Sequence, residues 1–290
     1  MDLLRLDAPL PHDLRDPVVL LALDGWTDAG EGGSIAAEEL RAQLGSVRVG
    51  AFDPDRLYDY RDRRPVLDID RGVLGDPEWP ALEVHVLRSA VGPDLVLVVG
   101  GEPDLSWRRL CDDVVALAQQ VGARRYVGLG SVPGPVPHTR PVRLLTTSSD
   151  EALLERLGRP HERVVVPGSC QVIVETALRD AGLTTLGLWA RIPHYVASTY
   201  PEAARTLLTA LDEQLGLGLD LGVFAEDIER TQAKLAVAAD GSPEVRAHIA
   251  ALEEAYDQDL AEDGVISGPL PTGDQIAAEL ERFLRQQGDD

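Results

Sequence analysis

Short apolar runs, rich in valine and leucine, recur through the first three-quarters of the sequence and alternate with segments of helical periodicity. Runs of this length and composition predict strands that are buried on both faces. They cover residues 18–23, 82–87, 95–99, 126–129 and 185–190. Residues 47–52 and 66–69 are weaker strand candidates, the second of them inside the charged, Asp/Arg-rich segment 53–71.

Helical patterns fill the intervals between these runs. They cover residues 34–44, 104–121, 149–157, 169–181 and 201–215. Strands that alternate with helices in this way are typical of a three-layer α/β fold, because each crossover helix covers one face of the sheet. The sequence therefore predicts such a fold, with a mainly parallel sheet.

The pattern changes after about residue 218, where strand-like runs end and helix-forming residues dominate. Helices are predicted over 224–239, 243–260 and 274–287. In the last of them, apolar residues at helical spacing form one stripe that must pack on the chain itself or on a partner: Ile276, Leu280, Phe283 and Leu284. We therefore expect a core domain over 1–218 and a helical C-terminal extension over 219–290, packed on the core or on a neighbouring subunit.

Charge and composition exclude several classes of function. With 27 basic against 49 acidic residues, the net charge of −22 opposes binding to nucleic acid or to an anionic membrane surface. Lys234 is the single lysine, and its polar helical surroundings argue against a phosphate-binding or Schiff-base lysine. Two cysteines and the lack of an N-terminal apolar run predict a cytoplasmic protein. The expected partner is a protein surface or a small molecule.

The Gly-rich stretch "LALDGWTDAGEGGSIAAEEL" (21–40) does not match known phosphate-binding loops. Glu31 and Gly32 stand where a P-loop needs Lys and Ser/Thr, and Ile35 replaces the third glycine of a dinucleotide fingerprint. The favoured interpretation is a strand-to-helix turn, with ligand or metal binding by Asp24, Trp26 or Asp28 as the alternative.

Two further turns follow predicted strands and carry polar residues. In an open α/β sheet, loops at the carboxyl ends of parallel strands converge on one crevice, where ligands usually bind. The candidate ligand-binding residues of this crevice are Asp24, Trp26, Asp28, Glu102, His138 and Arg140, with His194 as a residue of mainly structural role. Arg140 would bind an anionic group, while a carboxylate or His138 would transfer protons.

No complete catalytic pattern is present. Ser131 lacks the glycines of a nucleophile elbow, since Leu129 and Pro133 occupy those positions. Ser169 and Cys170 begin a predicted helix that could lower the thiol pKa, although Cys170 fits an inert buried thiol better. We therefore assign no catalytic residue, no metal site and no cofactor, and a non-enzymatic protein is favoured over a hydrolase-like enzyme or small-molecule binder.

Four segments, in order along the chain, carry a family resemblance. They are the G-W-x-D-A-G loop from Gly25, "RPVRLLTTSS" from Arg140, "WARIPHYVASTYPEAARTLLTALDEQLGLGLD" from Trp189 and "PLPTGDQIAAELERFL" from Pro269. Together they resemble the proteasome assembly chaperone 2 family in its actinobacterial branch. This resemblance spans nearly the whole sequence.

The resemblance implies a phosphorylase/hydrolase-like α/β/α core with a mixed sheet and added C-terminal helices. It also implies a homo-oligomer, with a trimer as one candidate order, and a proteasome-related or other protein partner. Proteasome-docking proteins often end in a hydrophobic residue, a tyrosine and one further residue. The sequence ends in "QGDD", so tail insertion of that type is not expected.

Overall fold

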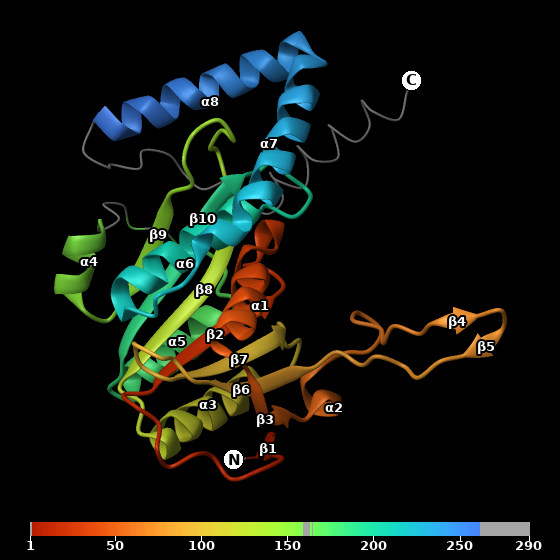
Figure 1. The fold of residues 1–290 in the computed structure, drawn as a ribbon, viewed down its shortest axis with the longest axis vertical. Coiled ribbons are helices and arrows are strands. Elements are labelled where there is room, and N and C mark those ends of the chain that lie inside the picture. The colour runs from red at the N-terminus through yellow and green to blue at the C-terminus, as the bar shows by residue number, and fades with distance from the viewer. Residues whose placement is uncertain (1, 159–162, 164, 262–290) are drawn as a thin grey trace.

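The computed structural model describes residues 2–158, 163 and 165–261. Within them, eight strands form one sheet in the order β1-β3-β6-β7-β2-β8-β10-β9 (Figure 1). The strands are β1 (Leu4–Leu6), β2 (Val18–Asp24), β3 (Val47–Phe52), β6 (Leu82–Leu87), β7 (Leu95–Gly101), β8 (Arg125–Gly134), β9 (Leu144–Ser148) and β10 (Thr184–Pro193).

The centre of the sheet is parallel and its edges are antiparallel. Strands β7, β2, β8 and β10 pair in parallel. On one side β6, β3 and β1 follow in successive antiparallel pairings, and on the other side β9 pairs antiparallel with β10. Five of the eight described strands (β2, β3, β7, β8 and β10) therefore share one direction, in a mixed and mostly parallel sheet.

Helices cover both faces of this sheet. Helices α3 (Trp107–Val121) and α5 (Cys170–Asp180) pack on one face, and α1 (Gly32–Leu44) and α6 (Pro201–Leu215) pack on the other. Strand β2 contributes to both cores, since Val19 and Leu21 pack with α3 and α5 while Val18 and Leu20 pack with α1 and α6. The three-layer α/β/α class predicted from the sequence is confirmed.

The long predicted elements agree with the structure, and the differences concern short elements. Residues 47–52, 82–87 and 201–215 match β3, β6 and α6. Strands β1 and β9 and the single-turn helix α2 (Pro54–Leu57) were not predicted, because each is short and depends on distant pairing partners. The candidate strand at 66–69 is shorter than predicted, with Ile69 and Asp70 forming β4.

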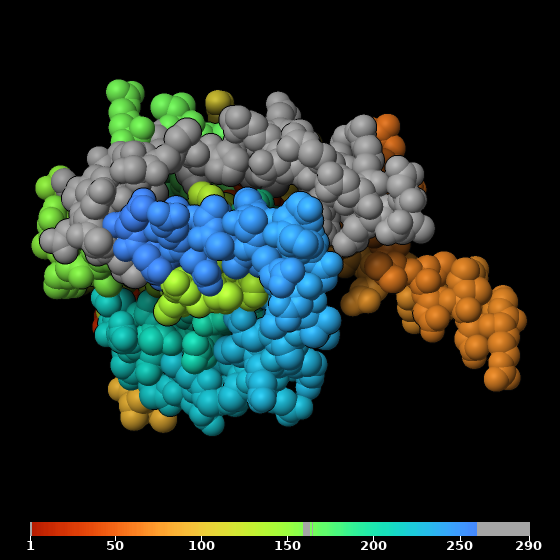
Figure 2. Space-filling view, turned by 90° about the horizontal axis from the view of Figure 1, so that it is seen from above, coloured from red at the N-terminus to blue at the C-terminus, as the bar shows by residue number. Residues whose placement is uncertain are grey.

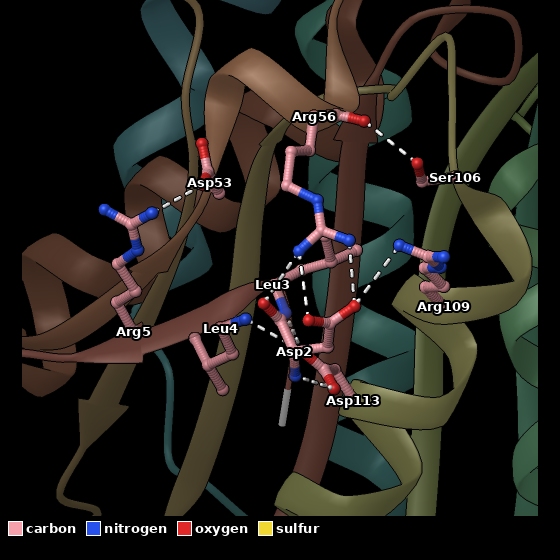
Figure 3. Close-up of polar contacts among 9 residues, drawn as sticks. All are labelled: Asp2, Leu3, Leu4, Arg5, Asp53, Arg56, Ser106, Arg109 and Asp113. Carbon is pink, nitrogen blue, oxygen red and sulfur yellow. Dashed lines mark hydrogen bonds and ion pairs between the residues drawn. The ribbon is translucent and has the colours of Figure 1, made fainter.

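The N-terminal strand is held by an aspartate of α3. The buried Asp113 carboxylate accepts hydrogen bonds from the backbone N–H groups of Asp2, Leu3 and Leu4 at 2.8, 2.6 and 2.7 Å (Figure 3). Arg56 adds an ion pair to Asp2, which lowers the pKa of that carboxyl through the hydrogen bond from the guanidinium. Strand β1 is thereby fixed beside β3 at the sheet edge.

A long hairpin arm projects from the body of the molecule (Figure 1). At its tip β4 (Ile69–Asp70) pairs antiparallel with β5 (Val73–Leu74). Nearer the body, Val66 and Glu78 exchange backbone hydrogen bonds of 2.9 and 2.7 Å. We call residues 66–79 the arm.

The described part of the C-terminal extension, up to residue 261, is helical, as predicted. After the short turn η2 (Leu221–Phe224), helix α7 (Ala225–Asp240) leads to α8 (Pro243–Ala261), which lies across the segment that follows β8 (Figure 2). The tyrosine hydroxyl of Tyr256 donates a 2.9 Å hydrogen bond to the carbonyl of Pro141. The predicted helix at 274–287 and its apolar stripe lie outside the described residues.

The remaining described elements are short: the turn η1 (Ala29–Glu31) before α1 and helix α4 (Glu151–Leu157) after β9. Asp150 caps α4 by accepting hydrogen bonds from the N–H groups of Ala152 and Leu153. None of the described helices has the length and apolar character needed to cross a bilayer.

Candidate functional site

Glu102 joins three segments at the carboxyl edge of the sheet. It follows β7, and its N–H donates a 2.7 Å hydrogen bond to the carbonyl of Asp24 at the end of β2. Its carboxylate accepts hydrogen bonds from the N–H of Trp26 (2.9 Å) and from the N–H of Cys170 (2.7 Å). Because Cys170 begins α5, the negative charge also lies at the positive end of that helix. Glu102 therefore connects the opening loop to α5.

Asp24 and Trp26 lie beside Glu102 but differ in their contacts. The Asp24 carboxylate pairs with Arg63 at 3.2 Å, and the same guanidinium donates to the Asp24 carbonyl. The Trp26 side chain is 61% exposed. Three of the predicted residues thus share one part of the edge, and Arg63, which the sequence did not single out, neutralises one of their charges.

Asp28 is buried and serves the start of α1. Its carboxylate accepts hydrogen bonds from the Gly33 N–H (2.6 Å) and from the Ser34 hydroxyl (2.5 Å). Burial raises the pKa of Asp28, while these hydrogen bonds act in the opposite direction. Gly33 has no room for a side chain, since an added Cβ would lie 2.8 Å from the Leu129 carbonyl oxygen. This supports the interpretation of the opening loop as a tight strand-to-helix turn.

His138 and His194 lie beyond the ends of β8 and β10 and meet around Tyr195. The Tyr195 hydroxyl accepts a hydrogen bond from the His138 backbone N–H (2.9 Å) and lies 2.8 Å from its Nδ1. In the neutral ring with its proton on Nε2, Nδ1 accepts from this hydroxyl; in the other tautomer Nδ1 donates to it. Burial also lowers the pKa of His138. His194 Nδ1 lies 3.2 Å from the carbonyl of Gly134.

Arg140 is engaged by α8. Its guanidinium forms ion pairs with Asp257 at 2.7 Å and with Glu253 at 3.2 Å. The hydrogen bond with Asp257 raises the pKa of Arg140, and the same bond lowers the pKa of Asp257. The positive charge predicted to bind an anion is thus paired with carboxylates of the C-terminal helix.

The seven predicted residues therefore occupy three separate settings. Asp24, Trp26 and Glu102 surround the start of α5, Asp28 is enclosed at the start of α1, and the remaining three lie under α8: His138, Arg140 and His194. Their binding of a ligand stays a prediction. No group of three His, Cys, Asp or Glu side chains in the described part of the chain is arranged to hold a metal ion.

The candidate nucleophiles have structural contacts. The Ser131 hydroxyl donates to the Ala29 carbonyl at 2.6 Å, and the Ser169 hydroxyl accepts from the Val172 N–H as the cap of α5. Cys170 is fully buried, and this burial raises the pKa of its thiol, with the nearby Glu102 charge acting in the same direction. The alternative interpretation was that the start of the helix lowers the pKa of the Cys170 thiol. In the structure the effect of burial is larger.

Among the buried polar side chains that the sequence did not single out are Glu175 and Arg191. Glu175 on α5 accepts hydrogen bonds from Thr147 and Thr185, and Arg191 on β10 is 5% exposed. The burial of Arg191 could have been inferred from the sequence. The residue interrupts the continuous apolar run "LGLWARIP", and such runs form strands that are buried on both faces. Glu175 gives no such signal, since its helix could have presented it to solvent.

The fold and these contacts define a class of protein: an α/β/α sandwich with a projecting arm and with a C-terminal helix, α8, attached to the segment that follows β8. The chain belongs to the PAC2 family, whose model matches residues 22–239.

Solved structures from actinobacteria resemble the chain closely. A Mycobacterium tuberculosis protein of unknown function, Rv2714, is 35% identical, with 90% of each chain covered and a TM-score of 0.83. A PAC2 family protein from Streptomyces avermitilis is 33% identical, covering 80% of this chain and 99% of that one, with a TM-score of 0.72.

A third relative has a more specific description. The Mycobacterium tuberculosis proteasome-assembly chaperone homologue Rv2125 is 28% identical, with 80% of this chain and 99% of that one covered and a TM-score of 0.75. Among curated proteins, no match was found.

Proposed function

We propose that this protein is a cytoplasmic, non-enzymatic interaction factor that resembles an assembly chaperone and works as a homo-oligomer. The observation that carries the proposal is the arm, which presents apolar side chains away from the body. Membership of the PAC2 family and similarity to a proteasome-assembly chaperone homologue support it. The proposal includes the division into a core over 1–218 and an extension over 219–290.

The arm has the properties of a protein-binding element. Its exposed large apolar side chains are Val66, Leu67, Ile69, Val73, Leu74 and Trp79. Val73 and Leu74 at the tip are 71% and 68% exposed. A two-stranded hairpin cannot bury such side chains alone, and clustered apolar exposure marks protein interfaces. A second copy of the chain is the proposed occupant, since the family resemblance implies self-association.

The net charge also favours a protein partner over nucleic acid or an anionic membrane. At −22, the surface repels nucleic acid and anionic lipid, but an apolar arm binds through burial of area and does not need opposite charge. The proposed client is a proteasome-related protein, by analogy with the mycobacterial homologue. The order of the oligomer is open, and a trimer is one candidate.

The oligomer is tested by light scattering after size exclusion, across a concentration series. We expect the wild type to be oligomeric and the double variant Val73→Asp, Leu74→Asp to be monomeric. The matched control is Val237→Asp, since Val237 is also an exposed valine, 74% exposed, but lies on α7. A monomeric wild type, or an arm variant that stays oligomeric, would contradict the proposal.

The client is tested separately by affinity purification from the native cell, followed by mass spectrometry. Specific recovery of proteasome subunits with the wild type supports the assembly role. Recovery of this protein alone at high yield counts against it.

A further inference from the structure

Arg191 is a buried cation for which the described part of the chain offers no acidic partner. On β10 its neighbours Ala190 and Ile192 pack with α1 and α6, so Arg191 points to the opposite face of the sheet. The residue is 5% exposed, and its Nε is buried without a hydrogen-bond partner. Among the described residues, no carboxylate lies within ion-pair distance of it. Such a group is expensive to bury unless an anion pairs with it.

A second arginine lies next to it. The Arg191 backbone N–H donates a 2.9 Å hydrogen bond to the carbonyl of Arg143, just before β9. The two residues therefore lie side by side on neighbouring segments of the chain. The Arg143 guanidinium lies over the ring of Tyr256 on α8, 5.6 Å from its centroid. Burial and the nearby Arg143 charge both lower the pKa of Arg191.

A glycine leaves room for the Arg191 side chain itself. Gly134 ends β8, and an added Cβ there would lie 3.3 Å from the Arg191 Nε. Among the described residues, Asp259 of α8 exerts an acidic influence on Arg191 without forming an ion pair. Two other acids of this helix, Glu253 and Asp257, are already paired with Arg140. Within the described part of the chain, Arg191 and Arg143 therefore lie next to each other with no carboxylate at ion-pair distance.

We propose that Arg191 and Arg143, enclosed by the end of β8 and by α8, form a binding site for a small oxyanion, such as a phosphate or a carboxylate. The planar guanidinium of Arg191 donates to the anion, Arg143 supplies the second charge, and Tyr256 of α8 holds Arg143 in place. This site is independent of the arm and goes beyond the proposed function. It also links ligand binding to the position of α8, since that helix forms one wall.

The test uses the full chain, with inorganic phosphate as the first probe and malonate as the second, titrated calorimetrically at constant ionic strength. We expect one site per chain, and removal of either guanidinium should weaken binding about 10-fold or more, as lost charge-assisted hydrogen bonds do. The variants are Arg191→Met and Arg143→Met. Arg125→Met is the matched control, because Arg125 lies at the opposite end of β8 in an ion pair with Asp16. Phosphate and malonate affinities distinguish the two sources of oxyanion.

Two further variants keep the test decisive if Arg191→Met fails to fold. Arg191→Lys retains the charge but loses the planar fork, so we expect weaker binding with an unchanged circular dichroism spectrum. Asp259→Asn removes a competing carboxylate, so its affinity for the probes should be equal or higher. Absence of binding by the wild type, or equal affinity in Arg143→Met and wild type, would overturn the proposal.

Discussion

Buried carboxylates in this protein act as structural acceptors. Glu175 illustrates this, since its oxygens accept hydrogen bonds from the Thr147 hydroxyl at 2.9 Å and from the Thr185 hydroxyl at 3.4 Å. Gly187 makes room for it, because an added Cβ would lie 2.7 Å from a Glu175 oxygen. Burial raises the pKa of Glu175, and this effect is larger than the opposing effect of the two threonines.

Glu175→Gln should change the pH dependence of stability. An acid whose pKa is raised on folding binds its proton more tightly in the native state than in the unfolded state. Its contribution to stability therefore falls as the pH rises from the pKa of the unfolded state through the pKa of the folded state. The variant should therefore melt at a higher temperature than the wild type at neutral and alkaline pH. The two should converge below about pH 4, the unfolded range of a glutamate.

The check is thermal unfolding by circular dichroism across this pH range. Glu213→Gln is the control, since Glu213 is an exposed glutamate on α6 and its variant should follow the wild-type curve. Parallel curves for Glu175→Gln and wild type at every pH would disprove the assignment.

At the scale of elements, side chains from segments distant in the sequence hold the edges and ends of the sheet. Asp113 of α3 fixes β1, Glu102 joins the opening loop to α5, and Arg140 holds α8 over the segment after β8. Each of these side chains bonds backbone or charged groups far away in the sequence. Short or peripheral elements thus depend on single polar residues more than on their own propensity.

Asp113→Asn should release β1. Three backbone N–H groups would lose a charged acceptor, so we expect a loss of roughly 2–4 kcal/mol in the free energy of unfolding. Urea denaturation measures this loss, and hydrogen exchange of the Leu3 and Leu4 amides should become faster. Asp112→Asn is the matched control because Asp112 is the exposed neighbour on the same helix. Equal stability of Asp113→Asn and wild type would show that β1 does not depend on this carboxylate.

At the scale of the whole molecule, net charge and exposed apolar surface have opposite effects on self-association. The net charge of −22 makes copies of the chain repel, while the arm offers apolar area for association. The balance between the two should depend on ionic strength, because salt screens the repulsion and leaves apolar burial intact.

Raising NaCl from about 50 mM to about 500 mM should therefore shift the population toward the oligomer, since the Debye length falls several-fold. Sedimentation velocity measures the distribution. The arm variant Val73→Asp, Leu74→Asp should stay monomeric at both salt concentrations. Dissociation of the wild type on adding salt would instead indicate an interface held by ion pairs.

The fold was largely predictable because long buried strands and amphipathic helices leave a strong pattern. Residues 82–87 form β6 and residues 201–215 form α6, as predicted. The arm was not predictable as a projecting element, since Ile69 and Val73 look like ordinary strand residues in the sequence. Only the absence of a neighbouring strand leaves them exposed.

For the candidate site, the sequence predicted the position of some residues but not their contacts. Asp24 and Glu102 do lie at adjacent strand ends, as the rule for parallel strands requires. The pairing of Arg140 with Asp257 joins positions 117 residues apart, and no local pattern announces it. The burial of Arg191 was visible only as an anomaly in an apolar run.

The sequence by itself determined the layers, the family and the classes of partner that its charge excludes, because these depend on local periodicity, motif order and composition. The tertiary structure decided which polar groups meet. It paired Arg140 with α8, enclosed Asp28 and placed Arg191 beside Arg143. The physical reason is that hydrogen bonds and ion pairs act over a few ångströms in space, and distance along the chain does not reveal that proximity.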